Sequence, residues 1–173
     1  MYIRQTRYSA QRHLRLGRNI CDARHGSRGS RFKRVDRFRG GWRLDRSDLY
    51  AMAGAQPGDI DFLQTYDDYP VIVMMQYEGH GLCAEGEGAE FVRTHTLDCE
   101  GTMPTNTSGG QLSMGQAGAA GGYLGLVETV RQLTDRPLGK AVPDANIGLV
   151  SGFGMITYDR CLCTGALILA RSE

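Results

Sequence analysis

The sequence predicts an α/β fold, because segments with the periodicity of strands and of helices alternate along it. Three segments have the composition and length of strands: Asp59–Gln64, Ala145–Ile156 and Thr164–Ala170. Between them, apolar residues recur at helical spacing from Leu126 to Leu133. With 173 residues, 41% of them hydrophobic, the chain is long enough for one domain with a substantial core.

Charge divides the chain into a basic arm, residues 1–46, and an acidic body, residues 47–173. The arm holds 14 of the 20 basic residues, nearly all of them arginine, and only 3 of the 19 acidic ones. Its 13 arginines against a single lysine and its repeated Arg-Gly and Ser-Arg pairs favour a disordered segment, or translation in a wrong frame that separated the body from a true first half. A transit-like segment and a tail for nucleic acid or anionic surfaces are the alternatives.

The body is expected to open with a helix at Asp48–Ala53, because Ser47 can cap its start and Gly54 can end it. The strand at residues 59–64 follows. The next apolar segment, Val71–Met75, is ambiguous: its β-branched residues favour a strand, whereas the preceding Pro70 favours the first turn of a helix.

The most informative segment is Asn106–Gly122, which is dense in glycine and alanine and leads directly into the amphipathic helix. Glycine permits positive φ angles and close backbone approach, so this turn can direct amide N–H groups toward an anion or a reacting oxygen. The helix is expected to turn Glu128, Arg131 and Gln132 outward and to end near Pro137–Gly139.

The last two strands are joined through Tyr158–Cys161, which gives the order β-α-β-α-β-β. None of the apolar runs approaches the length needed to cross a bilayer. Five cysteines without a recognisable secretory signal predict reduced thiols and a cytoplasmic protein.

From about Asp48 to the end, the body resembles the C-terminal half of the thiolase family. The resemblance lies in Pro57–Asp61, the acidic and aromatic segment Gln64–Pro70, the glycine-rich Gly81–Gly88, and Asn106–Gly110, which is similar to the family's N-x-x-G-G motif. The Gly-His-Pro position of the family reads Gly115-Gln116-Ala117 here, as is familiar in the sterol-carrier-type branch.

The resemblance implies a thiolase-like half with a mixed five-stranded sheet and a buried helix, layered α-β-α, and favours a helix at Val71–Met75. It also implies an acyl-CoA C-acyltransferase whose substrate is a coenzyme A thioester, with no further cofactor and no metal. The nucleophilic cysteine of the family belongs to the half that is not matched, so we expect this chain to be impaired or inactive alone.

Two alternatives stay open. One is a thiolase-like retro-aldolase acting on a steroid-type acyl-CoA. The other is a non-catalytic scaffold that pairs with a small zinc-ribbon and OB-type acyl-CoA-binding protein. As a partner, either that protein or a second copy of this chain is expected; a membrane is not, and nucleic acid is disfavoured because the aromatic residues of the body do not interleave with basic residues.

The resemblance assigns the catalytic positions to Gln116, Asn106 and Tyr158. Gln116 replaces the family's histidine, and an amide can polarise a thioester carbonyl but cannot take a proton at neutral pH. Asn106 and the amides near Gly109 and Gly110 would steady the loop that ends at Gly115, unless the turn serves packing alone.

Tyr158, beside an aspartate and an arginine, can act as an acid, a base or an oxyanion donor. The nearby Cys161 and Cys163 are better explained as buried small residues. Gly152 and Gly154 lie in Ser151–Gly154, which resembles a glycine-rich strand end near the family's second catalytic position; there this chain has Val150 or Ser151, neither of which is a base.

Tyr66 and His80 complete the expected substrate-binding set. Tyr66 precedes Asp67 and Asp68, a pair more typical of a solvated helix cap than of an acid and base. His80 is expected in an exposed, flexible turn of a loop that faces the acyl chain in the resembled family.

Overall fold

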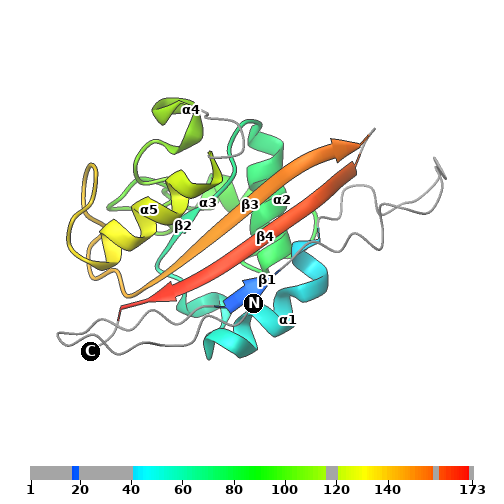
Figure 1. Cartoon of the computed structure of the whole chain (residues 1–173), viewed down its shortest axis with the longest axis horizontal. Coiled ribbons are helices and arrows are strands. Elements are labelled where there is room, and N and C mark those ends of the chain that lie inside the picture. Colours follow the sequence, from blue (N-terminus) through cyan, green and yellow to red (C-terminus); the bar gives the residue numbers. More distant parts are fainter. Residues whose placement is uncertain (1–16, 20–40, 116–120, 158–159, 172–173) are drawn as a thin grey trace.

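The computed structural model describes residues 17–19, 41–115, 121–157 and 160–171. Its sheet has the order β1-β4-β3-β2 (Figure 1), built from β1 (Gly17–Asn19), β2 (Phe62–Gln64), β3 (Ile147–Thr157) and β4 (Arg160–Ala170). β2 runs parallel to β3, whereas β4 is antiparallel to both β3 and β1. The sheet is therefore mixed, as expected.

The expectation of five strands is not met in the described residues. Three strands come from the body, and the short β1 comes from the arm and pairs with Ala166–Ile168 of β4. On the other side of β2, Thr105 forms only an isolated parallel bridge with Leu63. A single bridge fixes one residue, so the segment leading to Asn106 does not continue as a strand.

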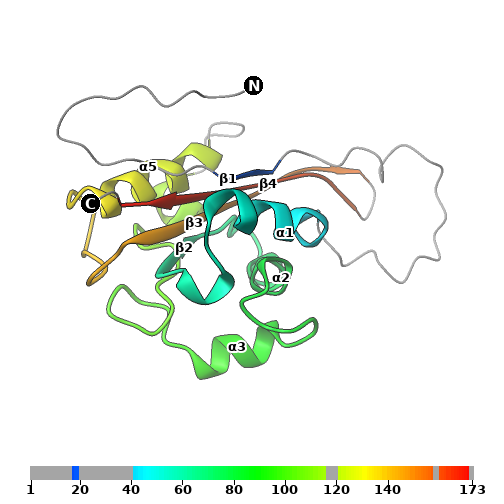
Figure 2. The ribbon, with the colours of Figure 1, turned by 90° about the horizontal axis from the view of Figure 1, so that it is seen from below.

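Helices cover both faces of the sheet, which gives the α-β-α layers that the family resemblance implies. Figure 2 shows α1 (Trp42–Ala53), α2 (Pro70–His80) and α3 (Gly88–Thr94) on one side of the strands. On the other side lies α5 (Gly122–Leu133), preceded by the short α4 (Gly110–Met114). None of the helices in the described part of the chain is long and apolar enough to span a bilayer.

Two apolar clusters hold these layers together, and β2 contributes to both because alternate side chains of a strand face opposite sides. Leu63 packs with Leu49 of α1 and Tyr77 of α2, while Phe62 packs with Leu133 of α5. All five of these residues are almost completely buried. Burial of apolar area at about 25 cal/mol per Å² is the main stabilising contribution of such clusters.

The helix ends follow the sequence in part. Gly54 ends α1 in the left-handed conformation, and Pro70 occupies the first turn of α2, so the helical interpretation of Val71–Met75 is confirmed. The start of α1 is different: it begins at Trp42, within the segment assigned to the arm, and Ser47 lies inside the helix. Trp42 is buried and its indole N–H donates to Gly152 O at 3.2 Å, which accounts for the earlier start.

The predicted orientation of α5 is wrong at two of its three polar positions. Glu128 and Gln132 are buried, whereas Val127 is 49% and Tyr123 is 67% exposed. One face of the helix packs against the sheet, and the other face is exposed in this structure. A buried polar network, described below, turns the helix this way.

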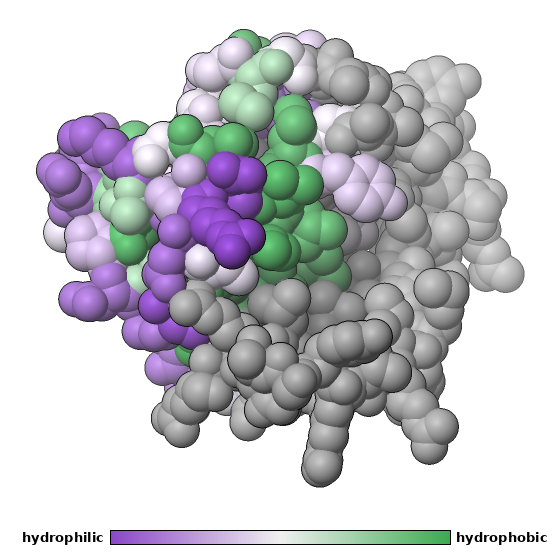
Figure 3. Space-filling view, turned by 60° about the vertical axis from the view of Figure 1, so that its left-hand side comes forward, coloured by the Kyte–Doolittle hydropathy of each residue, from purple (hydrophilic) through white to green (hydrophobic). Residues whose placement is uncertain are grey.

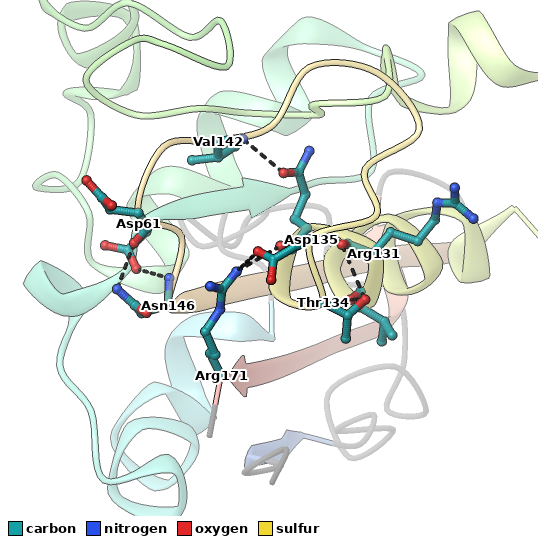
Figure 4. A network of polar contacts seen from close by, with 10 residues as sticks. Asp61, Arg131, Thr134, Asp135, Val142, Asn146 and Arg171 are labelled. Carbon is teal, nitrogen blue, oxygen red and sulfur yellow. Dashed lines mark hydrogen bonds and ion pairs between the residues drawn. The ribbon is translucent and has the colours of Figure 1, made fainter. Parts of the chain in front are cut away.

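Polar contacts fix the loop that joins α5 to β3 (Figure 4). Asp61 Oδ2 accepts hydrogen bonds from the amides of Asn146 and Ile147, both at 2.8 Å. At the other end of the loop, Arg171 forms an ion pair with Asp135 at 2.5 Å. The Asp61 contacts tie the start of β3 to the segment before β2, and the ion pair ties the end of α5 to the residue that follows β4.

Candidate functional site

A small polar cavity lies where α4, α5 and the end of β2 meet. Its volume of about 20 Å³ is enough for one water-sized group. Its walls are formed by backbone, amide and hydroxyl groups together with one valine: Gln64, Thr65, Asn106, Ser108, Gly110, Gln111, Gly122, Gly125, Val150 and Ser151. The cavity therefore sits beyond the carboxyl end of a parallel strand, where α/β sheets commonly bind ligands.

Asn106 is held in this wall by three hydrogen bonds to β2 and its continuation. Its side-chain oxygen accepts from Thr65 N at 2.7 Å, its Nδ2 donates to Thr65 Oγ1 at 3.1 Å, and its backbone amide donates to Leu63 O at 2.8 Å. Its φ angle of 52° lies in the left-handed region, which asparagine tolerates better than most residues. The residue is thus fixed as a rigid part of the site.

The glycines of the turn take the conformations that the sequence predicts, with φ angles of 94° at Gly109, 70° at Gly110 and 91° at Gly115. The start of α4 is not open to a ligand, however, because Gln111 N donates to Asp67 Oδ1 at 2.9 Å. A Cβ atom at Gly110 would collide with the other oxygen of that carboxylate. Asp67 is accordingly a helix cap, but for α4 rather than for α2.

Tyr66 and Asp68 form a pair beside this cap. The Tyr66 hydroxyl donates to Asp68 Oδ2 at 2.6 Å, and the Tyr66 ring lies 5.4 Å from the ring of Phe153 on β3. Gln76 of α2 forms two hydrogen bonds with the Tyr66 backbone: its Oε1 accepts from Tyr66 N at 3.1 Å, and its Nε2 donates to Tyr66 O at 2.8 Å. The other oxygen of Asp68 is buried without a hydrogen-bond partner among the described residues.

The expectation of an exposed turn at His80 is wrong. The residue ends α2, is completely buried, and packs near the ring of Trp42 at 6.1 Å. Its Nε2 lies 2.8 Å from Ser151 Oγ on β3. Burial, and to a smaller extent the charge of Arg46, lower the pKa of His80 to about 3, so the ring is neutral at physiological pH.

A buried polar network lies behind the cavity and was not anticipated from the sequence. Gln64 Nε2 donates to Thr107 Oγ1 at 2.8 Å, and that hydroxyl donates to Glu128 Oε1 at 2.9 Å. Gln132 Nε2 donates to the same carboxylate oxygen at 2.8 Å, and its own oxygen accepts from Val142 N at 2.9 Å. The sequence signal was the four-residue spacing of Glu128 and Gln132, which places both on one face of the helix.

The described thiols do not belong to the cavity. Burial raises the pKa of Cys83 to about 11, with smaller contributions from Glu78 and Glu87. Burial likewise raises the pKa of Cys99. Both side chains are therefore protonated at neutral pH, and a thiol attacks a thioester through its thiolate.

The structure brings together only part of the expected set. Asn106 and Gly110 line the cavity and Gly109 adjoins it, whereas the exposed Gly115 has no atom near the position of an added Cβ. Gly152 and Gly154 lie in β3 beyond Ser151, which the sequence indicates is not a base. Gln116 and Tyr158 lie outside the described residues, as do the side chains of Cys161 and Cys163.

Known proteins share this half of the fold. The chain is 35% identical to "Steroid side-chain-cleaving aldolase" of Thermomonospora curvata over 109 residues, and this matched region covers 63% of the chain. It is 32% identical over 106 residues, or 61% of its length, to human "Sterol carrier protein 2". A solved structure, "Ltp2-ChsH2(DUF35) aldolase", superposes with a TM-score of 0.63 at 30% identity and covers 76% of the chain.

The chain spans less than a third of each of these proteins: 27% of the Thermomonospora aldolase, 19% of the sterol carrier protein and 32% of the chain of the solved structure. Residues 40–165 match the family model described as "Thiolase C-terminal domain-like". That match includes Asn106–Gly110, the cavity wall and most of both long strands. The chain therefore belongs to the thiolase C-terminal domain-like family.

Proposed function

We propose that this domain is part of a thiolase-like retro-aldolase that cleaves a carbon–carbon bond in a β-hydroxyacyl-CoA of steroid type. The observation that carries the proposal is the Tyr66–Asp68 pair at 2.6 Å, which lies next to the cavity residue Thr65. A phenol coupled to a carboxylate can accept and return a proton. The name of the Thermomonospora relative supports the same reaction class.

The reaction needs fewer groups than thiolysis does. A base removes the proton of the β-hydroxyl, the Cα–Cβ bond breaks, and its electron pair becomes the enolate of the shortened thioester. The former hydroxyl carbon leaves as a ketone, and the enolate carbon is then protonated. No acyl group is transferred to the protein, so the reaction does not require a cysteine nucleophile.

The residues of the domain suit these steps. The Tyr66 phenol, with Asp68 as its proton acceptor, is proposed to exchange the hydroxyl proton, and Tyr158 is a second candidate for that role. Asn106 and Gln116 carry amide groups that can hold the thioester oxygen as negative charge develops on it. The coenzyme A thioester is the substrate, and these steps use no other cofactor.

Acyl transfer from acyl-CoA is the second candidate, because the family model is thiolase-like. It is less favoured because the glutamine at position 116 cannot act as the base that activates a nucleophile. Either activity would belong to an assembly in which this domain supplies one half of the site.

A partner of the DUF35 type is proposed on the name of the solved structure. The surface over α4 and α5 offers apolar area for a partner or a second copy: Leu112 is 67%, Met114 is 44%, Tyr123 is 67% and Val127 is 49% exposed. Figure 3, which turns this side of the molecule forward, shows hydrophobic surface next to strongly hydrophilic residues. Apolar patches with a polar rim are typical of interaction sites.

Because the chain alone is expected to be impaired, the test is product analysis by mass spectrometry after long incubation of a high concentration of the full chain with a steroid-type β-hydroxyacyl-CoA, with and without free coenzyme A. Retro-aldol cleavage gives a ketone and a shortened acyl-CoA in both conditions, and Tyr66→Phe should lower the rate at least about tenfold. The exposed Tyr69→Phe is the matched control. Cleavage of a 3-oxoacyl-CoA that depends on free coenzyme A, with the hydroxy compound left intact, would favour acyl transfer instead.

A further inference from the structure

Ser151 and His80 form a buried contact across two elements. Ser151 follows Val150, the β3 residue paired with the last residue of β2, and it belongs to the cavity wall. Its hydroxyl oxygen lies 2.8 Å from His80 Nε2 at the end of α2. Ser151 is 5% and His80 is 0% exposed, so neither polar group can be satisfied by bulk water.

Ser151 lies on the same face of the sheet as the Tyr66 ring. Side chains two residues apart in a strand share a face, so Ser151 and Phe153 point to the same side. Phe153 contacts the rings of both Tyr66 and Trp42, with centroids 5.4 Å and 5.8 Å apart. Ser151 therefore belongs to the cavity wall, and its side chain lies on the face of the sheet where the Tyr66 phenol of the proposed reaction lies.

The surroundings of the His80 ring select one tautomer. Its Nδ1 is buried and has no hydrogen-bond partner among the described residues. A proton on Nδ1 would leave a buried N–H donor unsatisfied, and such donors are rarer in proteins than under-satisfied acceptors. A proton on Nε2 avoids this, because Nε2–H can donate to Ser151 Oγ.

We propose that His80 holds Ser151 as a hydrogen-bond donor toward the thioester oxygen of a ligand in the cavity. Once Nε2–H occupies a lone pair of the serine oxygen, the serine's own hydrogen is left for another acceptor. The ring thus acts as a positioning residue, and Ser151 is the group that would touch the ligand. This inference rests on the proposed function, since it names a donor for the enolate that the reaction forms.

The direction of this hydrogen bond distinguishes the proposal from a serine nucleophile. A nucleophile would need the opposite tautomer, with Nε2 free to take the serine proton. A donor aimed at developing negative charge strengthens as the charge grows, and removal of one such donor lowers kcat by about 10²–10³-fold. KM should change little, because the contact is weak in the ground state.

The first measurement is the tautomer of His80 in the unsubstituted full chain, from ¹⁵N chemical shifts of selectively labelled histidine. The expected result is a protonated Nε2 and an unprotonated Nδ1. A proton on Nδ1 would overturn the assignment of Ser151 as a free donor. This measurement requires neither turnover nor a folded variant.

The second measurement uses acetyl-CoA labelled with ¹³C at its carbonyl as the probe. We expect the carbonyl resonance of bound acetyl-CoA to move downfield, and this displacement to be lost in Ser151→Ala and partly kept in Ser151→Cys, whose thiol is a weak donor. Ser47→Ala, an exposed serine of α1, is the control and should leave the resonance in place.

The outcomes separate the two proposals. If acetyl-CoA binds but its carbonyl resonance is the same in the parent chain and in Ser151→Ala, the donor role of Ser151 is wrong and the thioester site stands. If acetyl-CoA does not bind to the chain, the thioester site itself is contradicted, and the donor role with it.

Discussion

At the scale of single residues, the site depends on polar side chains that are fixed before any ligand arrives. The Asn106 amide binds Thr65 through its oxygen and one of its two N–H groups, and His80 contacts Ser151 from α2. Each is buried or half-buried, so each contact is protected from competing water. A preorganised donor loses little conformational freedom when a ligand binds.

Replacing Asn106 should show how much this preorganisation contributes to stability. Asn106→Ala removes two side-chain hydrogen bonds. It also places alanine, which has no polar side-chain group, at a left-handed φ angle of 52° that asparagine tolerates better. We expect the free energy of unfolding to fall by about 2–4 kcal/mol. Urea unfolding monitored by circular dichroism measures it.

Asp144→Ala is the matched control, because Asp144 has the same φ angle of 52° at an exposed position. We expect this variant to lower the free energy of unfolding only by the cost of alanine in the left-handed conformation, about 1 kcal/mol. Equal losses in the two variants would show that the contacts to Thr65 contribute nothing.

The buried His80 predicts a specific pH dependence of stability. Its pKa is about 3 in the folded chain and about 6.5 in the unfolded chain, so between these values the unfolded state binds more protons. Stability therefore falls as the pH is lowered from about 6.5, by roughly 1 kcal/mol per pH unit from this residue. Urea unfolding at pH 7, 6 and 5 measures the slope.

In His80→Gln the slope over the same range should be shallower by about that amount, whatever the change in absolute stability. Identical slopes in the parent and the variant would mean that the imidazole is accessible to protons in the folded state.

At the scale of elements, α5 shows what the sequence could and could not predict. The helical spacing of Leu126, Val130 and Leu133 predicts the helix, and the structure confirms it, but the helix ends at Leu133, before the expected end near Pro137–Gly139. The same spacing gives the wrong side for Glu128 and Gln132, because a pattern of polarity cannot reveal that Thr107 and Val142, distant in sequence, supply their partners. Buried networks depend on tertiary contacts that a local pattern does not contain.

The same limit explains the other differences between the predictions from sequence and the structure. Glycine positions such as Gly54 and Gly109 were predictable, since a left-handed φ angle is a local requirement. The burial of His80 was not, because it depends on Trp42, which the charge pattern assigned to the arm. The helix α3 was also missed, because the short segment Gly88–Thr94 has little amphipathic pattern of its own.

Two glycines of α5 give a matched pair that tests how closely this helix approaches the sheet. A Cβ at Gly125 would lie 2.9 Å from the Cβ of Gln64, whereas a Cβ at Gly122 would meet nothing within 4 Å. Gly125→Ala should lower the free energy of unfolding by about 1–3 kcal/mol, because overpacking outweighs the gain in helix propensity. Gly122→Ala should raise it by up to about 1 kcal/mol.

Thermal unfolding of the two variants decides the question. If Gly125→Ala is as stabilising as Gly122→Ala, the helix does not contact β2 as closely as described.

The buried network makes a second prediction at this scale. Glu128→Ala leaves the hydroxyl of Thr107 and the amide of Gln132 without their acceptor, so we expect a loss of at least about 2 kcal/mol in the free energy of unfolding. Glu100→Ala, at a carboxylate that is 70% exposed, is the control and should change it by less than about 0.5 kcal/mol. Equal effects would place Glu128 in contact with solvent.

At the scale of the whole molecule, the domain combines an acidic body, a basic arm and a cavity at the carboxyl end of β2. The arm complicates any binding measurement, because its 14 basic residues attract the phosphates of coenzyme A without regard to the acyl group. The cavity, in contrast, offers polar groups suited to a thioester oxygen. Affinity for coenzyme A alone therefore does not report on the cavity.

The most direct test is an amide chemical-shift titration of the full ¹⁵N-labelled chain with acetyl-CoA and, separately, with free coenzyme A. We expect acetyl-CoA to shift the amide resonances of Asn106, Gly110 and Ser151, and free coenzyme A to leave them largely unchanged. If both compounds give the same shifts, or if the shifts are confined to residues 1–46, the cavity is not a thioester site.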